Sequence, residues 1–194
     1  MISRALPIPP IAVKDESAVE LLRMWAVERG QHITISAQLW EDPASWGLLL
    51  VDLAQLIADA YVQTEGRHFD TTLARIRESS EAAWDTATDP RSKSVVVDMK
   101  ARELPIPCAA SNDQAALELV RVWVVKGAQH FTIATVRKDP SVWGIMLVDL
   151  AKNIASAYVQ AEGRSFQTVL AQIREGFGAE WDSPTDQPWG KLLE

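Results

Sequence analysis

The sequence predicts an α+β protein of two ββαα repeats related by a pseudo-twofold axis, with helices packed on one face of an antiparallel sheet. Two observations support this prediction. At an offset of 97, 28 of the 44 positions in residues 42–85 carry the same residue in residues 139–182. Within each copy, a segment of strand-like alternation precedes two segments of helical spacing. The chain is therefore a fused tandem duplication.

The duplication also sets the expected boundaries. We expect a first repeat at residues 1–90, a linker at 91–98, a second repeat at 99–186 and a C-terminal tail at 187–194. The linker prediction rests on the polar run Arg91-Ser92-Lys93-Ser94, which is typical of an exposed connection. Because units below about 100 residues gain core by association, we expect the two copies to merge.

Each copy opens with a Leu-Pro-Ile-Pro arm, at residues 6–9 and again at 104–107. Alternating prolines exclude a helix and favour an extended, polyproline II conformation. We expect each arm to pack across a neighbouring segment.

The next segment of each copy is interpreted as a β-hairpin. Residues 120–125 are rich in β-branched side chains, residues 126–129 have turn composition, and residues 130–136 alternate. In the first copy, residues 18–29 also fit an amphipathic helix opened by a Ser17-x-x-Glu20 capping box. We favour the hairpin, and the helix stays open as the alternative.

A hairpin requires a register that sorts side chains by face. A four-residue turn at 28–31 pairs Val27 with His32, Trp25 with Thr34 and Arg23 with Ser36. Opposite residues in an antiparallel pair share a face, so this register produces one apolar and one mixed side. The apolar side holds Leu22, Met24, Ala26, Ile33, Ile35 and Ala37, with Val120, Val122, Val124, Phe131 and Ile133 in the second copy.

Two helices should complete each copy. Asp42-Pro43 and Asp139-Pro140 indicate helix starts, with the carboxylate as N-cap and proline at the first helical position. An apolar stripe then continues to about Thr64, and Gly66 and Gly163 fit the position after a helix C-terminus. The second helix carries Phe69, Leu73, Ile76 and Trp84, matched by Phe166, Leu170, Ile173, Phe177 and Trp181.

Composition narrows the function classes. The net charge is −7, with no basic run, which argues against nucleic acid and anionic membranes as partners. Cys108 is the single cysteine, and the longest apolar runs are too short to span a bilayer. We therefore expect a cytoplasmic protein without metal or cofactor. Nucleophile-elbow, phosphate-loop and zinc-protease motifs are missing from the sequence.

The repeated sequence motifs form a distinctive pattern. Asp-Pro-x-x-Trp-Gly-x-x-Leu-Val-Asp-Leu-Ala is followed by Ala-Tyr and by Ile-Arg-Glu, and the second copy adds Trp-Val-Val, Gln-His and Glu180-Trp181. This combination resembles an uncharacterised bacterial family of domains of unknown function, whose members look like single copies. The resemblance implies that a single-copy relative dimerises and that this chain is such a dimer made covalent. It supplies no activity and no catalytic residues.

The mixed face of the predicted sheet is the first candidate surface. It carries Arg23, Trp25 and His32 in the first copy and Arg121, Trp123 and His130 in the second. An arginine, an indole and an imidazole on one face can bind an anionic or aromatic ligand. The competing interpretation is that helices or a protein partner cover this face.

Asp52 and Asp149 interrupt the most apolar part of the long helix, where Leu48 and Val51 extend the apolar character to the helix's outer side. Helical spacing puts Asp52 near Gln55 and Asp59, away from the core stripe, so a solvated position is one interpretation. The alternative is a partly buried carboxylate that needs a cationic partner, such as Arg23, Arg67 or a histidine.

Three functions follow from these observations. The leading hypothesis is a non-enzymatic interaction or scaffold module, formed by a covalent pseudo-dimer, that binds a protein partner or self-associates. The alternative is a small-molecule binding protein with its site at the pseudo-twofold on the sheet face. The third is a hydrolase or isomerase that uses His32 or His130 with an aspartate.

Overall fold

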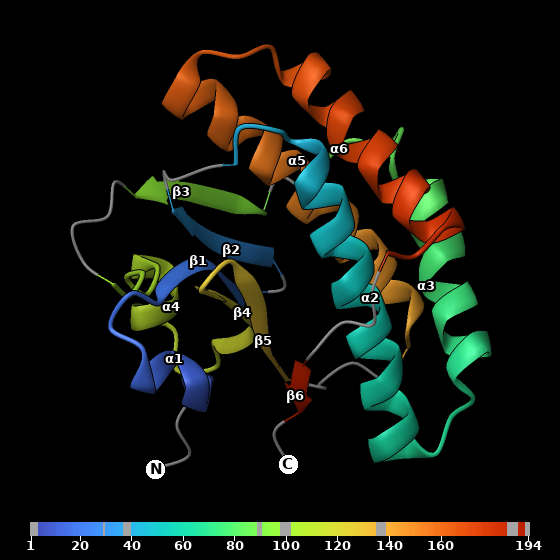
Figure 1. Cartoon of the computed structure of the whole chain (residues 1–194), viewed down its shortest axis with the longest axis horizontal. Coiled ribbons are helices and arrows are strands. Elements are labelled where there is room, and N and C mark those ends of the chain that lie inside the picture. Colours follow the sequence, from blue (N-terminus) through green and yellow to red (C-terminus); the bar gives the residue numbers. More distant parts are fainter. Residues whose placement is uncertain are drawn as a thin grey trace. The chain divides into compact units, whose positions relative to one another are not determined.

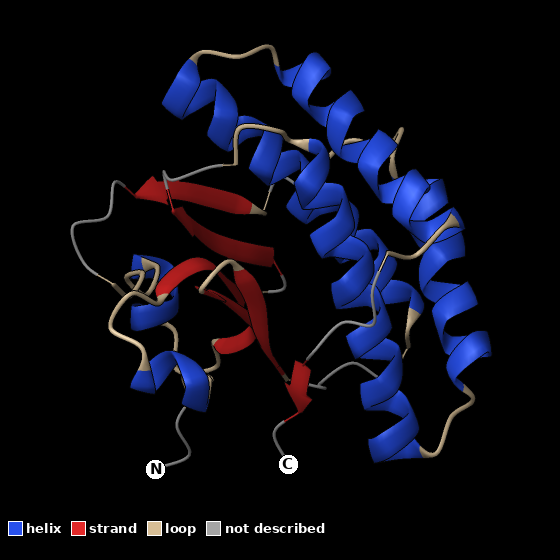
Figure 2. Ribbon diagram, viewed as in Figure 1, coloured by secondary structure: helices blue, strands red, loops and turns tan. Residues whose placement is uncertain are grey.

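The computed structural model describes residues 4–28, 30–36, 40–88, 91–97, 102–134, 139–185 and 190–192. The chain divides into two compact units, and each unit takes segments from both repeats. Residues 1–39, 89–134 and 189–194 belong to a sheet unit, and residues 40–88 and 135–188 to a helical unit. Strands and long helices are thus segregated, as expected for an α+β protein (Figures 1 and 2).

The sheet unit contains one six-stranded sheet in the order β3-β2-β1-β4-β5-β6. Its strands are β1 (Val19–Val27), β2 (Gly30–Ser36), β3 (Lys93–Val97), β4 (Leu117–Val125), β5 (Ala128–Ile133) and β6 (Gly190–Leu192). The two hairpins join through β1 and β4, which pair antiparallel. The alternative helix at residues 18–29 is wrong, because β1 occupies its described part.

The sheet is mixed, which corrects the expectation of a purely antiparallel one. β3 runs parallel to β2, and β6 runs parallel to β5. The stretch expected to be an exposed linker supplies β3, and the tail supplies β6. The physical reason is that a hairpin leaves its second strand with an open edge, which the β-branched run of Val95, Val96 and Val97 can pair with. Residue 98 and residues 187–189, 193 and 194 lie outside the described residues.

The hairpin register differs from the expected one by two residues. Trp25 pairs with His32 and Arg23 with Thr34, and the second copy pairs Trp123 with His130. The reason is a tighter turn, in which Glu28 has φ of 48° and its counterpart Lys126 has φ of 51°. A two-residue hairpin turn needs such left-handed residues. A shift of two preserves the side-chain alternation, so the predicted sorting into faces holds. Ala37 lies outside the described residues.

Most of the predicted apolar face is buried, and Ala26 and Val124 on it are half-buried. Leu22, Met24, Ile33, Ile35, Val120, Val122, Phe131 and Ile133 are each at most 3% exposed. Two short helices in the sheet unit were not predicted, α1 (Pro10–Lys14) and α4 (Cys108–Asn112). Each follows directly after an arm and contains five residues, too few for a sequence periodicity to show.

Four long helices form the helical unit: α2 (Ala44–Glu65), α3 (Phe69–Ala83), α5 (Ser141–Glu162) and α6 (Phe166–Asp182). The main packing partners come from different repeats, because α2 packs on α6 and α3 packs on α5. Glycines permit the close approach. A Cβ at Gly47 would overlap the backbone of Ile173, Gly176 and Phe177, and one at Gly144 would overlap the backbone of α3.

The helix ends follow the sequence closely. The Oδ1 atom of Asp42 accepts the N–H of Ala44 at 3.0 Å, and that of Asp139 accepts the N–H of Ser141 at 3.1 Å. The prolines occupy the cap position and each helix begins one residue later than predicted. Gly66 and Gly163 end α2 and α5 in the left-handed conformation, which confirms that prediction.

Both α2 and α5 are long and apolar enough to cross a membrane by length and composition alone. Their apolar windows are 67% and 78% buried inside the protein, as in the core helices of soluble proteins. Their apolar character is therefore accounted for by packing within the fold.

Candidate functional site

Two arginines occupy the centre of the sheet. Arg23 and Arg121 lie opposite each other in the β1–β4 ladder and are 2% and 3% exposed. Each pairs with a glutamate on the other strand. The Nε of Arg23 donates to Oε1 of Glu118 at 2.7 Å, and the Nε of Arg121 donates to Oε1 of Glu20 at 2.6 Å. We call these four residues the charge ladder.

The two arms cover the charge ladder, and each arm lies on the other repeat. The Leu104 carbonyl accepts from Arg23, while the Leu104 N–H donates to Glu20 at 2.6 Å. Reciprocally, the Leu6 carbonyl accepts from Arg121, and the Leu6 N–H donates to Glu118 at 2.6 Å. The arms therefore pack across a neighbouring segment, as the sequence predicts, and that neighbour is the opposite repeat.

The tryptophans of the same face are also covered. Trp25 packs with Ala110 of α4 and with Ala116, and Trp123 packs with Ala12 of α1 and with Ala18. Neither indole Nε1 has a hydrogen-bond acceptor among the described residues. The indoles thus contribute apolar contact area to two small cores beneath the short helices.

This arrangement corrects the expectation of an open ligand surface made of Arg23, Trp25, Arg121 and Trp123. Their side chains are buried by the chain's own arms and short helices. The competing interpretation had helices or a protein partner over this face; here the arms cover the arginines, and α1 and α4 pack against the tryptophans. A buried ion pair needs further hydrogen bonds to offset desolvation, and the arm backbones supply them.

The pKa of Glu20 is shifted by its position in the charge ladder. Burial raises the pKa of Glu20 to about 7, against the opposing effects of Arg121, Arg23 and the N–H of Leu104. The partly exposed Glu103 adds a third carboxylate, 2.6 Å from Arg121. The ladder is a structural element whose stability depends on protonation.

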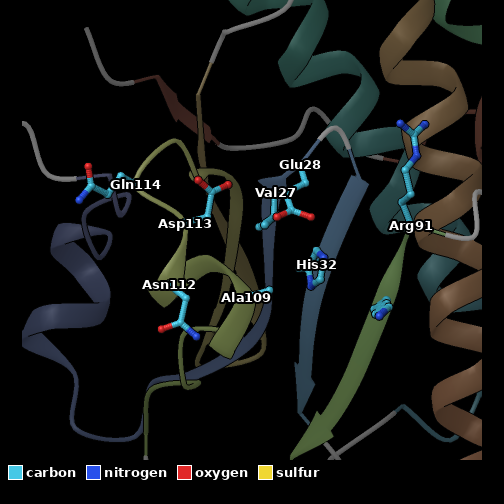
Figure 3. Close-up of a pocket in the computed structure, with 9 residues that line it drawn as sticks. Val27, Glu28, His32, Arg91, Ala109, Asn112, Asp113 and Gln114 are labelled. Atoms are coloured by element: carbon cyan, nitrogen blue, oxygen red, sulfur yellow. The ribbon is translucent and has the colours of Figure 1, made fainter.

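His32 is the predicted residue that lines a cavity. The cavity has a volume of about 570 Å³ and lies in the sheet unit. It is lined by Val27, Glu28, His32, Arg91, Lys93, Ala109, Asn112, Asp113 and Gln114. Figure 3 shows the α4 residues on one side, His32 and Arg91 on the other, and Glu28 between them.

Two backbone features, a left-handed turn and a close approach of two chain segments, position the residues that line this cavity. Glu28 occupies the left-handed turn position between β1 and β2, and a Cβ at Gly30 would lie 2.5 Å from the Arg91 carbonyl oxygen. Glycine thus lets the chain entering β3 run close beside β2. Lys93, the first residue of β3, pairs with His32 and shares its face.

The cavity walls carry opposite charges. Lys93 and the imidazole of His32 come from β3 and β2, whereas Asp113 and the amides of Asn112 and Gln114 lie on the α4 side. The pKa of His32 is lowered by burial and by Lys93, while Glu28 acts to raise it. His32 is therefore largely neutral at pH 7, and its environment includes both a cation and an anion.

His130 is the counterpart of His32 but has different neighbours. It is half-buried, in β5. At that end of the sheet Lys126 pairs with Asp15 at 3.7 Å, whereas at the His32 end Glu28 and Asp113 place two acids in one cavity. The two ends of the sheet have thus diverged in charge.

Asp149 is 6% exposed and Asp52 is half-buried, which favours the buried alternative over the solvated one. Both belong to the helical unit, whereas the arginines and His32 and His130 belong to the sheet unit.

Sequence reasoning missed a second cavity, of about 470 Å³, in the helical unit. Lys152 of α5 lines it together with loop residues 84–88 and one face of α6. The available signal was a difference between the copies, because Lys152 stands where the first copy has Gln55. Among the described residues, no cluster of three or more His, Cys, Asp or Glu side chains is arranged to hold a metal ion.

Comparison with known proteins identifies the repeat. A family model described as "Domain of unknown function (DUF5076)" matches the chain twice, at residues 5–88 and 103–185. The chain belongs to this family. The two DUF5076 matches coincide with the two repeats, so the resemblance inferred from the sequence is confirmed and the chain is a tandem duplicate of the family domain.

No curated protein matches the chain. Among solved structures, one match is described as a putative pyruvate dehydrogenase from the photosynthetic bacterium Rhodopseudomonas palustrus CGA009. It is 28% identical, with a TM-score of 0.42, and the match covers 50% of this chain and 100% of that one.

Proposed function

We propose that this DUF5076 protein is a non-enzymatic binding protein, built as a covalent pseudo-dimer, whose cavity beside His32 takes a small zwitterionic molecule. The observation behind the proposal is the composition of that cavity. Lys93 and His32 line it from the strands, while Glu28 and Asp113 line it from the turn and from α4. Such walls match a ligand that carries a carboxylate and an ammonium group, as a free amino acid does.

The pseudo-dimer part of the proposal rests on reciprocal contacts. The Arg23–Glu118 pair has its counterpart in Arg121–Glu20, and each arm makes the same two backbone hydrogen bonds to the opposite repeat. A pseudo-twofold axis through the β1–β4 ladder accounts for both. Duplication leaves the two ends of the sheet free to diverge, and they differ at the hairpin turn, where Glu28 in one repeat corresponds to Lys126 in the other.

The test uses the three histidines as reporters. Glycine, L-glutamine and L-phenylalanine share the charged head group and differ in side-chain size, so each is titrated while the imidazole C–H resonances are followed by NMR. We expect the His32 resonance to shift and those of His68 and His130 to stay in place. N-acetylated forms, which lack the ammonium charge, should bind at least about tenfold more weakly.

Single substitutions test the positive and the negative wall of the cavity separately. Lys93→Gln should weaken binding by removing the partner of the carboxylate, and Glu28→Gln by removing that of the ammonium group. Lys126→Gln, at the turn of the other hairpin, is the matched control and should change nothing. If none of the three amino acids moves the His32 resonance, or if Lys93→Gln binds them unchanged, the proposal is wrong.

A second candidate, the interaction module, is favoured by the edge strand β3. Among the described strands β3 lies at one end of the sheet order, and Val95 on it is 55% exposed. Open edges accept an added strand, and Lys93 at the start of β3 would meet an acidic residue of an extended partner segment. Lys93 and the nearby Arg91 place positive charge at this edge in a chain of net charge −7.

Native mass spectrometry of gently purified protein distinguishes the two candidates. A monomer that retains a small added mass supports the zwitterion proposal. A bound polypeptide that Val95→Lys releases supports docking on β3, and an apo monomer that also takes up none of the amino acids contradicts both.

A further inference from the structure

The helical unit buries a lysine, Lys152, beside a cavity. Lys152 is 5% exposed, and its Nζ donates to the carbonyl oxygens of Ala83 at 2.9 Å and of Thr86 at 2.7 Å. These carbonyls belong to the last residue of α3 and to the loop that follows it. Lys152 thus holds the C-terminus of α3.

The other repeat completes the same position without a lysine. Gln55 replaces Lys152, and Glu180 replaces Ala83. The helix α6 runs on to Asp182, and its end is held by the Glu180 carboxylate, which accepts the backbone N–H of Thr185 at 2.8 Å. The buried ammonium group of Lys152 thus has no counterpart at Gln55.

The lysine lines the cavity of about 470 Å³, whose other walls combine polar residues with an apolar part. Phe166, Leu170 and Ala171 contribute one face of α6, and Trp84 contributes an indole that is 6% exposed. Arg174 provides a second cation, since its guanidinium lies over the Trp84 ring and 3.1 Å from Asp85. A buried cation, the Arg174–Asp85 ion pair and two aromatic side chains are thus combined in one cavity.

We propose that this cavity binds a small carboxylate with an aromatic or aliphatic body, held by the ammonium group of Lys152. An ammonium has three donors, and two of them are used by Ala83 and Thr86. The third can donate to a carboxylate oxygen, while Phe166 and Leu170 contact the apolar body. This site is in the helical unit, so it is independent of the zwitterion proposal.

The electrostatics of Lys152 agree with this role. Burial lowers the pKa of Lys152, and the carboxylates of Asp149 and Asp85 act in the opposite direction. A bound carboxylate would stabilise the charged form further, so binding should raise the pKa of Lys152 and take up protons at a pH near that pKa.

Benzoate and benzamide form a matched pair of probes, since they share the ring and differ in charge. Each is titrated into the full-length protein while backbone amide resonances are followed by NMR. We expect benzoate to shift the amides of Thr86, Ala87 and Ala171, and to bind roughly tenfold or more tightly than benzamide.

Two variants test the role of Lys152. Lys152→Gln, which installs the residue of the first copy, should reduce benzoate affinity roughly tenfold and leave benzamide affinity unchanged. Ala171→Glu keeps Lys152 and its carbonyl contacts but places a negative charge on the cavity wall, so it should also weaken benzoate selectively. Lys126→Gln removes an exposed lysine elsewhere and should have no effect.

The outcomes are decisive in each direction. If Lys152→Gln lowers stability but benzoate still binds as before, or if benzoate binds no better than benzamide, Lys152 is only a helix cap. If Lys152→Gln fails to fold, unchanged benzoate binding by Ala171→Glu overturns the proposal. Loss of amino-acid binding at His32 leaves this site untouched, so the two proposals fail separately.

Discussion

Arg23 and Arg121 stand directly opposite each other across the β1–β4 ladder, where two like charges would repel. Each is neutralised by a glutamate of the other's strand, so the joint between the repeats is an alternation of buried charges. These buried ion pairs form only when both repeats are present, because neither repeat by itself contains both partners of an interstrand pair.

Removing one charge from the ladder should destabilise the protein strongly. Arg23→Leu leaves Glu118 buried without its main partner, which costs about 3–5 kcal/mol of unfolding free energy. The double variant Arg23→Leu with Glu118→Leu should recover much of the loss. Urea unfolding measures both. Arg77→Leu, which breaks an ion pair to the exposed Asp182, is the control and should cost at most about 1 kcal/mol. Equal losses at the two arginines would contradict the prediction.

The charge ladder should also make stability depend on pH. The pKa of Glu20 rises from 4.5 in the unfolded chain to about 7 in the folded protein. Between pH 4.5 and 7 the folded protein keeps a proton on Glu20 that the unfolded chain has lost. The stability that this proton contributes is therefore complete below pH 4.5 and is lost as the pH rises through 7. Glu20→Gln should remove about 1–3 kcal/mol of that pH dependence. Urea unfolding at pH 5 and pH 8 gives the change in unfolding free energy with pH for each protein. An equal change in the two proteins would refute the pKa shift of Glu20.

The arms should be essential for stability although they are irregular in structure. Leu104 is 1% exposed, whereas Ile106, two residues further along the same arm, is 41% exposed. Leu104→Ala should cost about 2–5 kcal/mol through a buried cavity. Ile106→Ala should stay within about 0.5 kcal/mol. Thermal and urea unfolding provide the comparison, and similar effects at both positions would show that the arm is not packed as described.

Helix packing should tolerate a side chain at Gly178 and reject one at Gly47. A Cβ at Gly47 would overlap the backbone of α6, and backbone cannot move aside as a flexible side chain can. Gly47→Ala should therefore cost about 1–3 kcal/mol or more. Apart from its chain neighbours and the backbone of its own helix, no heavy atom of the described residues lies within 4 Å of a Cβ at Gly178, so Gly178→Ala should stabilise α6 by about 0.5–1 kcal/mol. Destabilisation by both variants would contradict this reading of the helix interface.

Local rules predicted the elements of each repeat well. The β-branched run and alternation identified the hairpins, and Asp-Pro starts and glycine ends identified the long helices. The register was wrong by two residues because the turn type depends on whether Glu28 and Lys126 adopt a left-handed conformation, which their side chains do not signal. The prediction of which side chains share a face remained correct, because a register shift of two residues leaves every side chain on the same face.

The candidate site was less predictable. Sequence placed Arg23, Trp25 and His32 on one face, and that is where they lie, but it could not say what covers the face. Leu104 of the second repeat covers Arg23, about eighty positions away in the chain, and such a contact leaves no local pattern. The cavity beside His32 likewise depends on β3, whose polar first residues resembled a linker.

The sequence by itself determined the duplication, the α+β class, the hairpins, the long helices and the absence of standard catalytic motifs, because each follows from residue identity or short-range periodicity. Tertiary structure alone decided the exchange of the arms, the parallel edge strands, the burial of the charge ladder and the cavities at His32 and Lys152. These depend on which distant segments share a surface. That choice is made by the burial of apolar area and the pairing of buried charges over the whole chain, and short-range patterns do not record it.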